Sequence, residues 1–253
     1  MTKVSIIGSG NVAQHLIQAF QLDNSIEIVQ VFARTKKNLA HLLHSDRIIS
    51  DYSQLQAANV YIIAVSDDAI AEVSSALPFN NQLVVHTSGT VALTSITITN
   101  RRGVFYPLQT FSKDKAVNFK TIPLCLEAEN EKDFKTLSSI ASTISDAVYK
   151  INSEQRKALH IAAVFVNNFV NHLYQMGNEI CENNRVPFEI LKPLIQETAH
   201  KIITLSPKDA QTGPAKRNDL KTIEAHQQFL TDENQVNVYR ILTQSILNNG
   251  KKL

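Results

Sequence analysis

The sequence predicts an α/β protein with a mainly parallel sheet domain followed by an all-helical domain. Short apolar runs alternate with helical patterns through residues 1–150, a loop with two glycines joins the first run to the first helix, and no strand pattern follows residue 151. Strands that alternate with helices form parallel sheets through right-handed crossovers. We therefore expect a sheet domain at residues 1–152 and a helical domain at residues 153–253.

The expected strands are short runs rich in apolar residues, as strands buried on both faces of a sheet should be. In order, they are Val4–Ile7, Glu27–Ala33, Arg47–Ser50, Asn59–Val65, Leu83–His86, Val104–Tyr106, Ile122–Glu127 and Ala147–Ile151. Several intervening segments carry apolar residues at helical spacing. The expected helices of this domain are Asn11–Gln21, Lys37–His44, Asp68–Leu77 and Phe134–Ile144.

The second domain is expected to consist of helices only. A long helix starts near Ser153, and nothing breaks its pattern before Pro187. Three more helical regions follow, at Phe188–Leu205, at Asn218–Leu230 and from Asp232 to about Asn248. The last begins with a capping-box pattern, Asp232 followed by Gln235.

The composition excludes several classes of protein. The chain has 253 residues, of which 43% are hydrophobic and 19% charged, and its net charge is +2. These values are typical of a globular protein and do not favour a nucleic-acid or membrane partner. The longest apolar run, Ile161–Val166, is too short to cross a bilayer, and no hydrophobic leader is visible. Cys125 and Cys181 lie far apart, so we expect no disulfide, no metal site and a cytoplasmic location.

The segment from Gly8 to Ala13 matches the pattern G-x-G-x-x-A. It ends the first strand and opens the first helix, which is the context of a Rossmann-type dinucleotide loop. Gly8 would permit the tight turn, Gly10 the approach of a pyrophosphate, and Ala13 close packing of helix on sheet. A plain strand-to-helix turn is the alternative. The expected cofactor-binding residues here are Gly8, Ser9, Gly10, Asn11, Val12 and Ala13.

The end of the second strand indicates which dinucleotide would bind. NAD enzymes carry an acidic residue there, which holds the ribose hydroxyls. This chain has Arg34, Thr35, Lys36 and Lys37 instead, and these groups suit a 2′-phosphate. We therefore favour NADP over NAD; the alternative is that Lys36 and Lys37 only solubilise a helix start.

Polar residues follow the next two buried strands, at the edge where ligands of parallel sheets bind. Candidates that would border the ribose and nicotinamide are Val65, Ser66, Asp67, His86, Thr87, Ser88 and Gly89. Asp67 or its neighbour Asp68 could instead cap a helix, and His86 could be a structural histidine.

The long helix carries a narrow polar stripe. At 3.6 residues per turn, His160, Asn167, Asn171 and Asn178 fall on one line, and Asn168 borders it. Such a stripe on an otherwise apolar helix costs free energy unless it is hydrogen-bonded or faces a ligand. We expect His160, with Asn167 or Asn168, to face a substrate; a solvent-facing edge or a seam between helices is the alternative.

Two segments could add substrate contacts. Residues 206–219 form an expected long polar loop with three candidate substrate residues: Thr212 and Arg217 could face an anionic substrate, and Gly213 would make the loop rigid. Gln109 could reach the same site from residues 106–111. Alternatively, residues 206–219 could be a mobile surface loop, and residues 106–111 could be only a packed turn.

These residues together resemble the uncharacterised bacterial Rossmann-like NADP oxidoreductase family with a helical C-terminal domain of unknown function. The resemblance spans the chain and rests on the blocks Gly8–Ala13, His86–Gly89, Tyr106–Phe111, His160–Phe169 and Gln211–Asp219. More distantly, the chain is similar to pyrroline-5-carboxylate reductase, ketopantoate reductase and the beta-hydroxyacid dehydrogenases. The resemblance implies an NADP-binding domain, a helical domain that forms a homodimer and can complete the partner subunit's site, and a cleft between the domains.

One departure from the hydroxyacid dehydrogenases bears on the chemistry. They carry a lysine four residues before an asparagine on the first long helix, whereas this chain has Ala163 and Val164 there. His160 is the remaining proton donor, and imidazole groups exchange protons near neutral pH.

We therefore expect an NADP-dependent oxidoreductase that transfers a hydride between NADP(H) and a small carbonyl or imine compound. His160 would protonate the nascent oxygen or nitrogen, and Asn167, Asn168 or Gln109 would orient that group. A deazaflavin-linked reductase and a non-catalytic NADP-binding sensor module are the alternatives. The residues do not specify the substrate.

Overall fold

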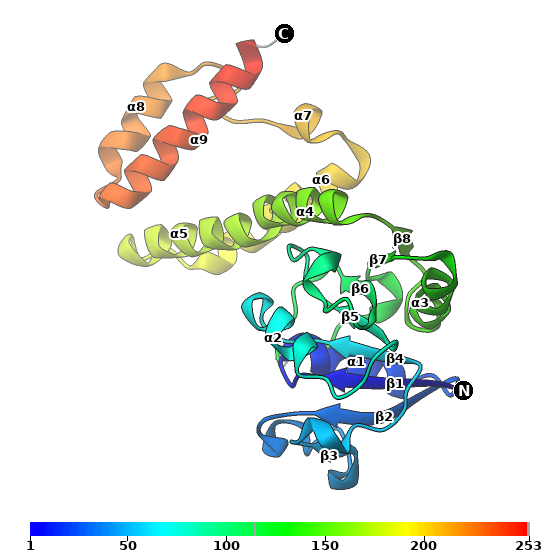
Figure 1. Cartoon of the computed structure of the whole chain (residues 1–253). Helices are drawn as coiled ribbons and strands as arrows, with labels where there is room; N and C mark the ends of the chain where they lie inside the picture. Colours follow the sequence, from blue (N-terminus) through cyan, green and yellow to red (C-terminus); the bar gives the residue numbers. More distant parts are fainter. Residues whose placement is uncertain (114, 252–253) are drawn as a thin grey trace. The chain divides into compact units, whose positions relative to one another are not determined.

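The computed structural model describes residues 1–113 and 115–251, and the chain forms two compact units, Met1–Asn167 and Asn168–Leu253 (Figure 1). The first unit contains a sheet, and the second contains only helices among its described residues. This is the predicted fold class. The division lies beyond the predicted boundary at residue 152, because helix α4 (Ser153–Ala163) packs within the first unit.

The described residues of the first unit form one eight-stranded sheet in the order β3-β2-β1-β4-β5-β6-β7-β8. Neighbouring strands are parallel except β6 and β7. The strand order reverses between β1 and β4, which is the switch point where ligands of such sheets bind. Each expected strand is present, as β1 (Thr2–Ile7), β2 (Ile26–Phe32), β3 (Ile48–Ile49), β4 (Val60–Ile63), β5 (Leu83–His86), β6 (Arg101–Pro107), β7 (Leu124–Ala128) and β8 (Val148–Lys150).

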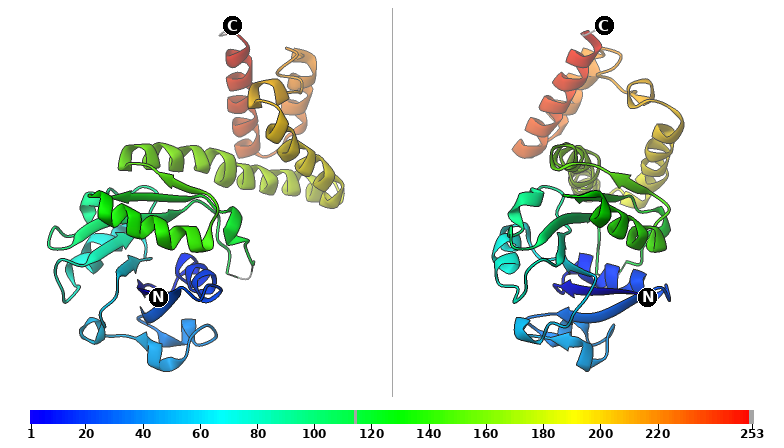
Figure 2. Two further views of the ribbon diagram at one scale, coloured as in Figure 1. Left: turned by 90° about the vertical axis from the view of Figure 1, so that its right-hand side faces the viewer. Right: turned by 45° about the vertical axis from the view of Figure 1, so that its right-hand side comes forward.

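Helices cover both faces of the sheet. The helices α1 (Asn11–Gln21) and α3 (Glu131–Ile144) lie side by side on one face, where they share a core with Ile6 (Figure 2). The short helix α2 (Ile70–Ser75) packs on the other face with Ile7. Successive residues of β1 thus enter different cores, as expected of a strand buried on both faces.

Three predicted helices differ from the structure. Residues 37–44 form a 3₁₀ turn, Lys36–Leu39, and further turns instead of a helix. The helix predicted at 68–77 is a 3₁₀ turn, Asp67–Ala69, followed by α2. Helix α3 begins earlier than predicted, because the Asn130 side chain accepts a hydrogen bond from the Asp133 amide at 2.9 Å and caps the helix.

The long helix predicted from Ser153 ends at Asn183. Two residues later, Arg185 adopts a positive φ of 57°, which a continuing helix does not allow. It is not a uniform α-helix, because a π-helical segment, Val164–Phe169, separates α4 from α5 (Val170–Asn183). A π-turn adds about one residue to the helix, which rotates the following residues by about 100°. The predicted alignment of His160 with Asn171 and Asn178 is therefore wrong.

The rest of the second unit is helical. Its elements are the 3₁₀ turn Phe188–Leu191, α6 (Lys192–Thr204), α7 (Pro207–Ala210), α8 (Leu220–Phe229) and α9 (Glu233–Lys251). Helices α8 and α9 lie side by side in Figures 1 and 2, and the His226 ring contacts the Tyr239 hydroxyl between them at 2.9 Å. The predicted loop at 206–219 contains α7, because Ser206 caps that short helix.

Many large apolar side chains of the second unit are exposed, and few are buried. The buried ones among its described residues are Met176, Cys181 and Ile223. The exposed ones include Leu173, Ile190, Leu194, Ile203, Phe229 and Ile241. Amphipathic helices are normally stabilised by covering such residues. Within the described part of the chain, none of the helices is both long and apolar enough to span a membrane.

Candidate functional site

A cavity of about 1130 Å³ lies at the edge of the sheet where β1, β2 and β4 end. Thr87, which follows β5, and Phe111, which follows β6, also line it. This is the edge where parallel sheets bind ligands. The predicted site residues that line the cavity are Gly8, Ser9, Gly10, Asn11, Val12, Arg34, Val65, Ser66, Thr87 and Gln109.

The first glycine of the loop is required by the backbone. Gly8 has a φ of 134°, and a Cβ atom there would lie 2.1 Å from the Ala64 carbonyl oxygen on the neighbouring strand segment. Any side chain at this position would clash with main-chain atoms in a backbone conformation that L-residues rarely adopt. Gly8 therefore allows β1 to turn sharply beside β4.

The second glycine leaves open space instead. Gly10 has an ordinary φ of −74°, and a Cβ atom there would meet nothing within 4 Å. Gly10 precedes the first turn of α1, which contains no acidic residue. The turn therefore presents backbone N–H groups and its positive dipole end to the cavity. The donor set and the open space fit a pyrophosphate group.

Two side chains hold this loop in place. The Asn11 amide donates to the Phe111 carbonyl oxygen at 2.9 Å, and the Gln14 amide donates to the Ser9 carbonyl oxygen at 2.9 Å. One turn later, Nε2 of the buried His15 lies 3.1 Å from the Ser112 carbonyl oxygen, which can only accept a hydrogen bond. The segment after β6 is thus fastened along α1 beside the cavity.

At the end of β2, the cavity combines a cation with an aromatic wall. Arg34 and Asn38 line it, and the Tyr52 ring stacks on Phe32 with the ring centroids 4.1 Å apart. Burial raises the pKa of Tyr52; the nearby carboxylate of Glu72 raises it further, whereas Arg34 lowers it. A guanidinium beside a stacked aromatic pair suits the phosphorylated ribose and the base of a nucleotide.

Sequence reasoning missed several of these residues. Phe32 lies two residues before Arg34 at the end of the same strand, so its position alone could have indicated it. Tyr52 gave no signal, because it lies in the 3₁₀ turn Tyr52–Gln54 and only the pairing of β3 with β2 brings that turn to the cavity. Glu72 and Val73, the α2 residues that line the cavity, were likewise read only as part of a helix.

Polar side chains of the loop itself and of the segment after β4 order the loop after β5. The Asp67 carboxylate accepts a hydrogen bond from the Thr90 hydroxyl at 2.5 Å. The Ser88 hydroxyl oxygen accepts from the Thr90 amide at 3.1 Å and from the Val91 amide at 3.0 Å. Asp67 and Ser88, both predicted cofactor residues, thus shape this loop and do not line the cavity.

His86 is fully buried at the end of β5, and its Nδ1 atom accepts a hydrogen bond from the Ser88 amide at 3.2 Å. Burial, with a smaller contribution from the charge of Arg156, lowers the pKa of His86 to about 4. The ring is therefore neutral at neutral pH, with its proton on Nε2. The structure places it as a support for the loop, which was one of the two predicted alternatives.

His160 lies beside the same loop. Its Nδ1 atom is 3.2 Å from the hydroxyl oxygen of Tyr106, which stands near the end of β6. A Cβ atom on Gly89 would lie 2.6 Å from that Nδ1 atom, so the imidazole touches the loop that also supplies Thr87 to the cavity. His160 itself does not line the cavity; it contacts the loop after β5 at Gly89, two residues beyond Thr87.

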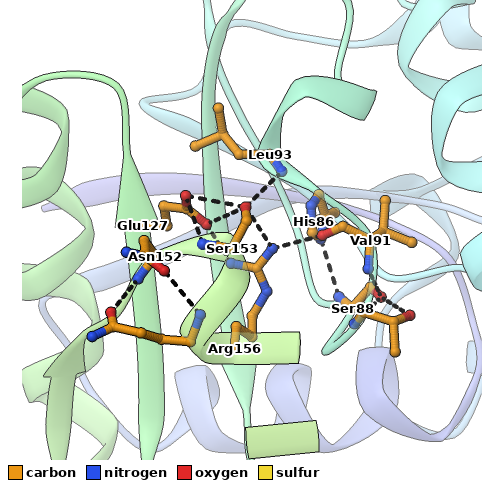
Figure 3. Close-up of polar contacts among 10 residues, drawn as sticks. His86, Ser88, Val91, Leu93, Glu127, Asn152, Ser153 and Arg156 are labelled. Atoms are coloured by element: carbon orange, nitrogen blue, oxygen red, sulfur yellow. Dashed lines mark hydrogen bonds and ion pairs between the residues drawn. The ribbon is translucent and has the colours of Figure 1, made fainter. Parts of the chain in front are cut away.

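A buried arginine anchors the helix that carries His160. Arg156 is 1% exposed; it is ion-paired with Glu127 of β7 and donates to the Val91 carbonyl oxygen at 2.6 Å (Figure 3). Ser153 donates to the same carboxylate at 2.8 Å. Arg156 and His160 are four residues apart on α4 and so share a face. The anchor thus determines which way His160 points.

The remaining predicted residues lie elsewhere. Thr35 and Lys36 are exposed and do not line the cavity, and Ala13 is buried on the face of α1 that packs in the core. Asn167 and Asn168 are exposed in the π-helical segment, a type of helix that often occurs at functional sites. The predicted substrate residues Thr212, Gly213 and Arg217 belong to the second unit, where Gly213 has a positive φ of 103°. In the described residues, no cluster of side chains could hold a metal ion.

Two family models match the chain. Residues 3–89 match a family described as NADP oxidoreductase coenzyme F420-dependent, and residues 122–246 match a domain of unknown function, DUF2520. Among proteins with curated functions, none matches this sequence.

Solved structures give further matches. A Bacteroides fragilis protein, provisionally named an NADP oxidoreductase, is 38% identical over 98% of both chains, with a TM-score of 0.87. A reductive aminase from Aspergillus terreus, solved with NADPH, has 13% identity over 99% of this chain and 95% of its own, with a TM-score of 0.71. Pyrroline carboxylate reductase from Plasmodium falciparum, solved with NADP, has 16% identity over 97% of this chain and 98% of its own, with a TM-score of 0.59. The last two likenesses concern the fold alone.

Proposed function

Because this chain belongs to the family of NADP oxidoreductases that includes the Bacteroides fragilis protein, we propose that it transfers a hydride between NADP(H) and a small carbonyl or imine compound. The observation that carries the proposal is the cavity at the switch point. The glycine loop and Arg34 line it, and the Tyr106–His160 pair contacts, at Gly89, the loop that supplies Thr87 to it.

Different cavity residues would bind different parts of NADP(H). The N–H groups of the first turn of α1 would hold the pyrophosphate, with Gly10 leaving room for it. Arg34 would bind the 2′-phosphate, beside the aromatic wall of Phe32 and Tyr52. Thr87 and Gln109 would border the nicotinamide. When bound there, NADPH supplies the hydride.

His160 supplies the proton that balances the reduction. The reduced carbonyl or imine carbon gains a hydride, and its oxygen or nitrogen gains a proton from the protonated imidazole. The imidazole becomes neutral and regains a proton from solvent. In the opposite direction, the neutral ring accepts that proton. Gln109 at the cavity, and Asn167 or Asn168 in the π-helical segment, would orient the reacting group.

Nucleotide titrations test the cofactor assignment. Arg34→Ala should weaken NADPH binding at least about tenfold and leave NADH binding nearly unchanged, because NADH has no 2′-phosphate. Lys36→Ala is the matched control, since Lys36 is exposed outside the cavity. Equal losses for NADPH and NADH in Arg34→Ala would contradict the NADP assignment.

Turnover with a panel of small ketones, aldehydes and imines tests the chemistry. His160→Gln should lower kcat by about 100-fold and leave NADPH affinity unchanged. His172→Gln, on α5, is the control histidine. Full turnover by His160→Gln would exclude His160 as the acid.

Turnover that required coenzyme F420 would favour the deazaflavin alternative, which rests on the description of the family model. Binding of NADPH without any turnover would favour a sensor.

We further propose that the partner is a second copy of this chain, bound through the exposed apolar side chains of the second unit. Leu194 and Ile203 of α6 are 62% and 76% exposed, although they are typical buried residue types. Leu194 and Ile203 are nine residues apart and so lie on opposite sides of α6, which leaves apolar side chains exposed around this helix, as expected where a second copy covers them.

A further inference from the structure

Tyr106 and His160 form a pair from segments far apart in the sequence. The Tyr106 hydroxyl oxygen lies 3.2 Å from Nδ1 of His160, and the two rings are tilted by 60°. Tyr106 is 9% exposed near the end of β6, and His160 is half-buried on α4. Tyr106 therefore occupies the Nδ1 side of the imidazole. Among the described residues, none forms a hydrogen bond with the other ring nitrogen, Nε2.

Gly89 provides the space for this pair. A Cβ atom at position 89 would lie 2.6 Å from Nδ1 of His160 and 2.9 Å from the Tyr106 hydroxyl oxygen. Any other residue would push the two side chains apart or displace the loop. The glycine therefore allows the hydroxyl, the imidazole and the loop beside the cavity to meet at one point.

Both partners stand on rigid supports. Tyr106 is in the antiparallel ladder of β6 and β7, opposite Cys125. His160 follows the buried Arg156 by four residues, and Arg156 is fixed to Glu127 and to the Val91 carbonyl. A side chain held in this way is preorganised, which is the property that catalytic groups need.

We propose that Tyr106 is a positioning residue that occupies Nδ1 of His160, so that Nε2 is the nitrogen that exchanges the proton with substrate. This inference rests on the proposed function, since it assigns the orientation of the acid named there. It adds Tyr106 and Gly89 to the residues on which the reaction depends.

The Tyr106 hydroxyl can remain hydrogen-bonded to Nδ1 whether the His160 imidazole is neutral or protonated. Burial raises the pKa of Tyr106 to about 12, so the hydroxyl keeps its proton at neutral pH. When His160 is neutral, with its proton on Nε2, the hydroxyl donates to Nδ1. When the ring is protonated, Nδ1–H donates to the phenol oxygen, and the same contact survives. After Nε2 gives up its proton, Nδ1–H keeps that partner.

The chain offers a matched control. His226 and Tyr239 form a second pair, with the hydroxyl oxygen 2.9 Å from Nδ1, between α8 and α9. Neither His226 nor Tyr239 lines the cavity or lies against Gly89. Tyr239→Phe therefore removes the same kind of contact from a histidine that has no role in the proposal.

Nitrogen NMR of histidine-labelled protein tests the pairing without requiring a substrate. Signals of His160 are assigned by their loss in His160→Gln. Tyr106→Phe should move the Nδ1 signal of His160 and change its tautomer ratio, whereas Tyr239→Phe should change only His226. Gly89→Ala, which keeps both side chains but separates them, should reproduce the effect of Tyr106→Phe. An Nδ1 signal of His160 that is unchanged in Tyr106→Phe would overturn the proposal.

If the panel yields a substrate, steady-state kinetics test whether Tyr106 affects proton transfer by His160. Tyr106→Phe should lower kcat about tenfold or more, shift the pH profile of kcat and leave the KM for NADPH unchanged. Tyr239→Phe should match the wild type. A lower kcat with an unmoved pH profile would indicate a purely structural role and overturn the proposal. If wild-type protein turns over nothing, the proposed function fails, while the NMR result still decides whether Tyr106 holds Nδ1.

Discussion

The Arg156 guanidinium donates to the Val91 carbonyl oxygen at 2.6 Å and so joins α4 to the loop that follows β5 (Figure 3). The same guanidinium is ion-paired with Glu127 of β7. One buried side chain thus connects three elements that come from distant parts of the sequence. Because these elements carry His160 and the Gly89 loop, the contact positions the candidate proton donor beside the cavity.

Removing this arginine should destabilise the protein strongly. Arg156→Met would leave the largely buried Glu127 carboxylate and the Val91 carbonyl without their partner, and losses of this kind cost about 3–5 kcal/mol. Urea unfolding measures the change in the free energy of unfolding. Lys150→Met is the control, because the Lys150–Glu131 ion pair is exposed and should contribute less than about 1 kcal/mol. Similar losses in both variants would show that Arg156 does not anchor α4.

The two glycines of the loop should respond differently to alanine. Gly10→Ala should leave the melting temperature nearly unchanged, because its Cβ would meet no protein atom, but should weaken NADPH binding at least about tenfold by filling the space for the pyrophosphate. Gly8→Ala should lower the melting temperature as well, because its Cβ would clash with the Ala64 carbonyl. Calorimetric titration and thermal unfolding measure the two effects. Unchanged NADPH binding in Gly10→Ala would place the pyrophosphate elsewhere.

Stability should fall in mild acid because of His86. Its pKa is lowered to about 4 by burial, whereas an unfolded histidine titrates near pH 6.5. Between these values the unfolded chain binds a proton that the folded chain does not, so the free energy of unfolding decreases as the pH falls from about 6.5 to about 4. The contribution of His86 to this loss should reach about 3 kcal/mol and stop increasing below pH 4.

His86→Asn should remove this part of the pH dependence, since asparagine does not titrate. Urea unfolding at several pH values between 4 and 7 gives the comparison. The exposed His44 supplies the control variant, His44→Asn, which should keep the wild-type slope. An unchanged slope in His86→Asn would mean that other groups cause the acid sensitivity.

Charged residues on α6 should separate the proposed dimer. Leu194→Lys combined with Ile203→Lys should shift the mass measured by light scattering from dimer to monomer, because lysine would bring charge into an apolar interface. Leu22→Lys is the control, since Leu22 is 89% exposed but lies at the end of α1 in the first unit. A wild-type protein that is monomeric at micromolar concentration would refute the dimer.

Local patterns determined much of this protein from the sequence alone. The apolar runs predicted each strand that the structure describes, because most of these strands are buried on both faces and so have little freedom in composition. The glycine loop and Arg34 were predicted as parts of one nucleotide site, and the structure brings them to one cavity, since each belongs to the end of a neighbouring parallel strand.

Contacts between distant segments were decided only by the tertiary structure. No periodicity indicates that a charged Arg156 is buried, or that Tyr106 meets His160 across 54 positions, because such contacts depend on how α4 packs on the sheet. The predicted asparagine stripe is wrong for a related reason: a uniform α-helix was assumed, and the π-helical segment Val164–Phe169 rotates everything after it. Local sequence specifies the elements, whereas packing and backbone insertions specify which side chains meet.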